Sequence, residues 1–125
     1  MEELVQKARN YFILARIAEK IEMYSKSASN YFKALSAIND FMLDKLNFKA
    51  KDHSERFMLL KSNLPELYII TDKLFSVYRR AYTSEINKDE IKLIKKNVED
   101  AFKNAKVEIP TDRDIEEKTE NLFKK

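Results

Sequence analysis

The stretch KSASNYFKALSAINDFMLDKL, residues 26–46, decides which fold the rest of the chain can adopt. Its apolar and alanine positions recur at steps of three and four residues, which is the period of one helix face. The main stripe comprises Ala28, Tyr31, Phe32, Leu35, Ile38, Met42 and Leu46. Ala34, Ala37 and Phe41 widen this stripe, so we expect the helix to contact neighbours on two sides. Such a helix indicates a helical bundle.

The same helical period continues on both sides of this stretch. It predicts a first helix over residues 2–23, a third helical run over residues 57–81 and a fourth helix over residues 88–106. Pro65 lacks an amide hydrogen and clashes one turn back, so we expect a kink or short break just before it. Short connections between four helices favour an up-down topology. The predicted fold class is all-α: an up-down four-helix bundle with a C-terminal helical appendage.

We expect the bundle to form one domain over residues 1–107, followed by a charged tail over residues 108–125. The tail should be a loosely docked helix over residues 112–124, because it offers few apolar anchors. These anchors are Ile115, Leu122 and Phe123.

Polar residues mark the predicted helix ends. Ser25 and Thr111 are suitable N-caps for the second and the last helix, because their hydroxyls can accept hydrogen bonds from unpaired amides. Asp52 or Ser54 could cap the third. Asn47 should end the second helix in the left-handed conformation that glycine usually takes.

Three residue types are absent or nearly so, and this excludes several kinds of site. The 125 residues include no cysteine, no glycine and one histidine, His53. Without cysteine there are no disulfides, thiol nucleophiles or cysteine zinc sites, and one histidine cannot form a zincin motif. Without glycine there is no Walker or G-x-G-x-x-G loop, in which backbone approaches phosphate closely. We therefore expect no metal and no cofactor, and any nucleotide must be held by side chains or helix N-termini.

The charge and hydropathy patterns bear on location and partners. The net charge is +3, and residues 45–61 hold five basic residues against two acidic ones. This basic segment is either a solvated surface or an RNA-binding surface. The chain has no run of 18 apolar residues, and its N-terminus lacks the apolar region of a signal peptide. We expect a cytoplasmic protein that does not enter a membrane.

The stretch FSVYRRAYTSEI, residues 75–86, holds the candidate site. Two adjacent arginines, Arg79 and Arg80, close the third helical run. In an up-down bundle this end lies beside the turn between the first two helices, where a positive groove suited to phosphate could form. Its other candidate ligand-binding residues are Tyr82, Tyr24, Lys26 and Asn30. The alternative is that the arginines only end a helix, paired with its carbonyls or with Glu22 or Glu85.

His53 precedes the third helical run, so the same topology places it at the opposite end of the bundle, far from the arginines. It either caps or orients that helix, or it takes part in a reaction.

Three stretches together resemble the HEPN family of small prokaryotic helical proteins: IAEKIEMYSKSASNYFKALSAINDFMLDK, KAKDHSERF and LFSVYRRAYTSEI. The resemblance covers roughly residues 4–106. It consists of the alanine and aromatic spacing of the second helix, a histidine after it, and Tyr-Arg-x-Ala-Tyr at the close of the third.

The resemblance implies a four-helix bundle that often dimerises and pairs with a small nucleotidyltransferase in toxin–antitoxin operons. Active family members are metal-independent RNases with an Arg-x(4–6)-His motif. Arg79 and Arg80 match the arginine of that motif, whereas residues 84–87 are Ser-Glu-Ile-Asn and include no histidine.

Our first hypothesis is a non-catalytic HEPN-like module, a homodimer, that binds a nucleotidyltransferase-type protein or a nucleotide or RNA. Because the motif histidine is missing, we expect no catalytic residue. The first alternative is a metal-independent RNase of the same family with a displaced active site. The second is a plain helical adaptor without a ligand.

Overall fold

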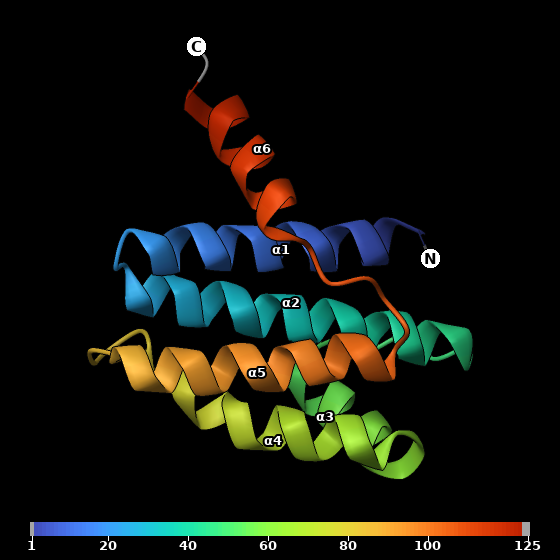
Figure 1. Cartoon of the computed structure of the whole chain (residues 1–125). Coiled ribbons are helices and arrows are strands. Elements are labelled where there is room, and N and C mark those ends of the chain that lie inside the picture. Colours follow the sequence, from blue (N-terminus) through green and yellow to red (C-terminus); the bar gives the residue numbers. More distant parts are fainter. Residues whose placement is uncertain (1, 124–125) are drawn as a thin grey trace.

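The computed structural model describes residues 2–123, and its regular elements are all α-helices (Figure 1). They are α1 (Glu2–Lys20), α2 (Tyr24–Lys45), α3 (His53–Asn63), α4 (Pro65–Arg80), α5 (Lys88–Asn104) and α6 (Asp112–Phe123). The all-α prediction is confirmed. The bounds of α1, α2 and α5 lie within three residues of those predicted from the hydrophobic period.

Helix α2 is the centre of the molecule. It packs against α1, α3, α4 and α5, so four helices of the same chain fill the widened stripe. Figure 1 shows α1, α2, α5 and α4 as roughly aligned rods, with α3 lying against α4. The core between them includes the edge-to-face ring pair of Phe12 and Tyr31, whose centroids are 5.4 Å apart.

The expected kink before Pro65 is instead a complete chain reversal. Leu64 leaves the helical conformation (φ −138°, ψ 68°), and Pro65 begins a new helix, where its missing amide hydrogen costs nothing. Helix α3 then lies antiparallel to α4: the Phe57 ring packs on Tyr68 and Phe75. The prediction of one bent third helix is therefore wrong, because proline is tolerated in the first turn of a helix as well as at a kink.

Three helices end in a left-handed residue although the chain has no glycine. Glu22, Asn47 and Lys106 have φ values of 62°, 66° and 57°. Each follows the end of a helix and allows the next amide to reach back five residues, as in the bond from the Met23 amide to the Ala18 carbonyl (2.8 Å). The prediction for Asn47 is confirmed. At Glu22 and Lys106 a residue with a Cβ takes a conformation that glycine adopts at lower cost.

The predicted caps were correct at two of three helix starts. Asp52 accepts a hydrogen bond from the Glu55 amide at the start of α3, and Thr111 from the Asp114 amide at the start of α6. Ser25 does not cap α2, because the tight turn at Glu22 lets this helix begin at Tyr24, so Ser25 lies inside its first turn.

Helix α6 docks only by its first turns and then leaves the bundle at a steep angle (Figure 1). Ile115 is fully buried against the bundle, and Arg16 and Arg9 of α1 pair with Asp112 and Asp114 at 3.0 and 3.3 Å. Hydrogen bonding from Arg16 lowers the pKa of Asp112 below its usual value. Leu122 is 52% exposed, so the prediction that it anchors the tail is wrong. The side chain of Phe123 lies outside the described part.

Within residues 2–123, no helix is both long and apolar enough to cross a membrane.

We predict that Lys106→Gly raises the free energy of unfolding by about 0.5–1 kcal/mol, because glycine relieves the steric cost of the left-handed conformation. The matched control is Lys103→Gly, which places glycine in the last turn of α5 and should lower stability by a similar amount. Urea unfolding followed by circular dichroism measures both. Destabilisation by Lys106→Gly would show that this end of α5 is not left-handed.

Candidate functional site

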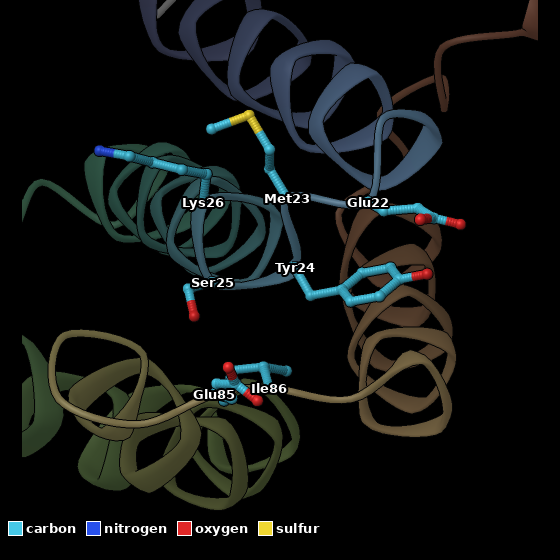
Figure 2. Close-up of a pocket in the computed structure, with 7 residues that line it drawn as sticks. All are labelled: Glu22, Met23, Tyr24, Ser25, Lys26, Glu85 and Ile86. Atoms are coloured by element: carbon cyan, nitrogen blue, oxygen red, sulfur yellow. The ribbon is translucent and has the colours of Figure 1, made fainter.

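The loop after α4 meets the α1–α2 turn, as the sequence predicted for these two connections. Ser25 Oγ donates to the Ser84 carbonyl at 3.4 Å. Between the two segments lies a hollow of about 400 Å³ (Figure 2). It is lined by Glu22, Met23, Tyr24, Ser25, Lys26, Glu85 and Ile86. Of the sequence-predicted ligand-binding residues, Tyr24 and Lys26 line this hollow.

The two arginines have different surroundings. Arg80 pairs with Glu90, which also closes the capping box at the start of α5, so this pair ties the end of α4 to α5. The Arg79 guanidinium lies over the Phe75 ring, 5.9 Å from its centroid, and is exposed. Within residues 2–123, Arg79 forms no salt bridge, and neither arginine lines the hollow. Glu22 and Glu85, the two partners proposed from the sequence, pair with neither.

Tyr82 reaches back over α2 and forms a pair with Tyr78. Their hydroxyl oxygens are 2.9 Å apart and their rings meet edge to face at 5.4 Å. The hydrogen bond between the two hydroxyls raises the pKa of Tyr78 to about 12 and lowers that of Tyr82. The charges of Lys33 and Lys26 lower the pKa of Tyr82 further, and the Lys33 ammonium lies 5.9 Å from the centroid of the Tyr11 ring on α1. Asn30 lies on the same stretch of α2, where its amide donates to the Lys26 carbonyl at 2.9 Å.

His53 does not lie at the far end of the bundle. Its ring centroid is 6.0 Å from that of Phe32, 5.8 Å from Phe75 and 6.0 Å from Tyr78. The prediction that it is remote from the arginines is wrong, because the reversal at Leu64 carries α4 back past the start of α3. His53 and Arg79 both lie against Phe75.

Hydrogen bonds that link Asp40, Arg56 and His53 determine which ring nitrogen of His53 carries the proton. Arg56 forms two hydrogen bonds to Asp40, at 2.8 and 3.1 Å, and its third nitrogen lies 2.9 Å from His53 Nδ1. A guanidinium only donates, so Nδ1 must accept, and in the neutral ring the proton is therefore on Nε2. Burial and then the Arg56 charge lower the pKa of His53. At pH 7 the ring is a neutral hydrogen-bond donor with no free basic nitrogen.

Sequence reasoning missed the residues that give the site its shape. Phe32, expected in the apolar stripe, is buried and its ring also stacks on Tyr78 (4.4 Å, 16°), while the Arg79 guanidinium lies over the Phe75 ring. Lys33 could have been found, because it lies seven residues after Lys26 and so on the same face of α2. No group of three or more possible metal ligands occurs in the described residues.

Comparison of the chain with family models, with curated proteins and with solved structures gives no match.

We predict that the single histidine titrates with a midpoint below 6.5, because burial and Arg56 both disfavour its charged form. The folded pKa is lower than the unfolded one, so His53 supports folding fully above about pH 6.5 and this support is lost as pH falls through the folded pKa. The ring signals in an NMR titration report one residue only. Arg56→Gln should raise the midpoint. A wild-type midpoint above 6.5 would contradict the described contacts.

Proposed function

We propose that this chain is a non-catalytic HEPN-like helical module that forms a homodimer and binds a nucleotide through its phosphates, or a nucleotidyltransferase-type protein. In this proposal α1, α2, α4 and α5 are the four helices of an up-down bundle, with α3 folded back on α4. The module acts in the cytoplasm of a prokaryotic cell as one component of a toxin–antitoxin pair.

The observation that carries the binding proposal is the exposed Tyr82 with the exposed Arg79 one turn back on α4. The Arg79 guanidinium lies over the Phe75 ring without a carboxylate partner among residues 2–123, and the charges of Lys33 and Lys26 on α2 contribute to the lowered pKa of Tyr82. Tyr82 is 66% exposed, so its ring offers a face to a base while the cations attract phosphates. This surface differs from the adjacent hollow, where Glu22 and Glu85 oppose anionic ligands.

The hydrogen bonding and the lowered pKa of His53 support a non-catalytic role. A general base needs an unoccupied nitrogen with a pKa near the working pH, and a general acid needs a proton that it can release. In His53 the accepting nitrogen is occupied by Arg56 and the pKa is lowered. Its contacts with Phe32 and Phe75 also hold the ring in place. A structural role for His53, at the joint of α2, α3 and α4, accounts for these contacts.

Single substitutions distinguish the proposed binding role of Arg79 from the structural role of Arg80. Arg79→Ala should weaken ATP binding at least tenfold, about 1.4 kcal/mol, and leave the melting temperature near that of the wild type. Arg80→Ala should lower stability by up to about 1 kcal/mol, because it breaks a partly exposed pair with Glu90. Isothermal titration calorimetry with ATP and thermal unfolding measure these effects.

Lys61→Ala is the matched control, because Lys61 also lies over an aromatic ring, that of Tyr68, at 5.9 Å. It should leave ATP binding unchanged. If Arg79→Ala and Lys61→Ala weaken binding equally, the binding is non-specific. If the wild type binds neither ATP nor a nucleotidyltransferase, the binding proposal is wrong.

A metal-independent RNase is the second candidate, favoured by the approach of His53 and Arg79 to the same ring, Phe75. Our proposal predicts that single-stranded RNA and tRNA remain intact after incubation with the protein, since His53 has no free basic nitrogen. RNA fragments on a denaturing gel that disappear with His53→Ala would overturn the non-catalytic proposal.

A further inference from the structure

The contacts of His53 leave one polar atom of its ring unused. Nδ1 lies 2.9 Å from Arg56, and the ring packs on Phe75 and Tyr78. Among residues 2–123, no group forms a hydrogen bond with Nε2, and His53 is exposed. Because Nδ1 accepts, the proton of the neutral ring is on Nε2. His53 therefore offers a neutral N–H donor that no described group of the chain uses.

This donor lies close to the cation of the proposed nucleotide site. The Arg79 side chain folds back along α4, so that its guanidinium lies 5.9 Å from the centroid of the Phe75 ring. The His53 ring centroid is 5.8 Å from the same centroid. In the described part of the chain, Arg79 forms no salt bridge. Two hydrogen-bond donors without a protein acceptor thus lie against one ring, and both can bind an anion.

We propose that His53 is a phosphate ligand, whose Nε2–H donates to the distal phosphates of a nucleoside triphosphate beside the Arg79 guanidinium. The inference rests on the nucleotide site of the proposed function and names the class of nucleotide that this site takes.

The spacing along α4 favours a triphosphate over a monophosphate. In the proposed site the base stacks on Tyr82, whose ring centroid is 5.4 Å from that of Tyr78, and the Tyr78 centroid is 6.3 Å from that of Phe75. The seven residues from Phe75 to Tyr82 rise about 10 Å along the helix. The two donors at Phe75 therefore lie well away from the base. A triphosphate chain spans this distance, whereas the phosphate of a monophosphate is bonded directly to the ribose and ends short of it.

Asp40 and Arg56 fix His53 as a donor at Nε2. Two hydrogen bonds hold the Arg56 guanidinium on Asp40, and a guanidinium only donates, so a proton on Nδ1 would break the contact with Arg56. Phosphate oxygens accept hydrogen bonds, and a neutral imidazole N–H bonds to them without giving up its proton. The arrangement therefore supplies binding and orientation rather than proton transfer, in agreement with a non-catalytic module.

Two substitutions at His53 distinguish the donor from the packing of the ring. In His53→Asn, the amide oxygen takes the place of Nδ1 and still accepts from Arg56, but no donor remains at Nε2. In His53→Gln, the longer amide restores a donor at the place of Nε2. By calorimetry at neutral pH, His53→Asn should bind ATP about tenfold more weakly than the wild type, as expected for a lost hydrogen bond to a charged group. His53→Gln should bind ATP almost as tightly as the wild type. AMP binding should be the same in all three proteins.

An NMR measurement on the wild type needs no variant. Because the chain has one histidine, its ring nitrogens can be assigned directly. Nitrogen–proton correlation should place the ring proton on Nε2, and ATP should shift the Nε2 resonance while AMP leaves it unchanged. A proton on Nδ1, or an Nε2 resonance that ATP does not shift, would overturn the inference.

The outcomes distinguish this inference from the proposed function. If Arg79→Ala weakens ATP binding and His53→Asn does not, the nucleotide site stands and His53 is not its ligand. If His53→Asn and His53→Gln weaken ATP binding equally, or if His53→Asn weakens ATP and AMP binding equally, the loss comes from packing and the inference is wrong. A wild type that binds no ATP would contradict both the inference and the nucleotide site.

Discussion

The burial of α2 on most of its circumference constrains every other element of this protein. Because α1, α3, α4 and α5 all pack on this one helix, each must offer it an apolar face. Small residues such as Ala28, Ala34 and Ala37 allow close approach, but a surface of small residues specifies register poorly. Asn39 adds the missing polar constraint: its amide donates to Thr71 Oγ1 at 2.8 Å, and Thr71 in turn donates to the Leu67 carbonyl at 2.7 Å. A displaced α4 would leave these buried groups unpaired, at about 1–3 kcal/mol each.

The glycine-free helix ends determine where the surfaces of interest lie. The left-handed Glu22 reverses the chain between α1 and α2, and this tight turn forms one wall of the hollow and projects Met23 beside α1. The steric cost of such a conformation is tolerable because the reach-back hydrogen bond satisfies carbonyls that would otherwise be unpaired. The same few residues therefore shape the hollow between the α1–α2 turn and the α4–α5 loop.

The fold could be predicted from sequence where local information was sufficient. The three- and four-residue period located α1, α2 and α5, and Asn47 identified a left-handed helix end without glycine. Local information failed at Pro65, because a proline inside a helical pattern and a proline at the first position of a new helix have the same sequence signature. The choice between a bend and a reversal depends on whether α3 can pack against α4, which Phe57 allows through Tyr68 and Phe75.

The site was predictable only in outline. The meeting of the α1–α2 turn and the α4–α5 loop follows from topology, and the structure places Ser25 against Ser84. Which arginine is paired does not follow from topology, because adjacent residues point about 100° apart and the rotation of α4 against α5 decides which one meets Glu90. The ion pair of Arg56 with Asp40 joins residues on different helices, so no pattern in the neighbouring sequence predicts it.

His53 shows that a histidine close to an arginine and a tyrosine is not for that reason a catalytic base. The reversal that brings it beside Tyr78 also brings Arg56 into line with Asp40, since both depend on the same packing of α3 on α2. Asp40 orients the guanidinium with two hydrogen bonds, and the guanidinium then occupies the nitrogen that a catalytic base would need. Moving Arg56 away to free that nitrogen would leave Asp40 without its partner at a half-buried position, which costs more than an exposed pair is worth. The contact that holds His53 in place thus also occupies the ring nitrogen that a general base would use.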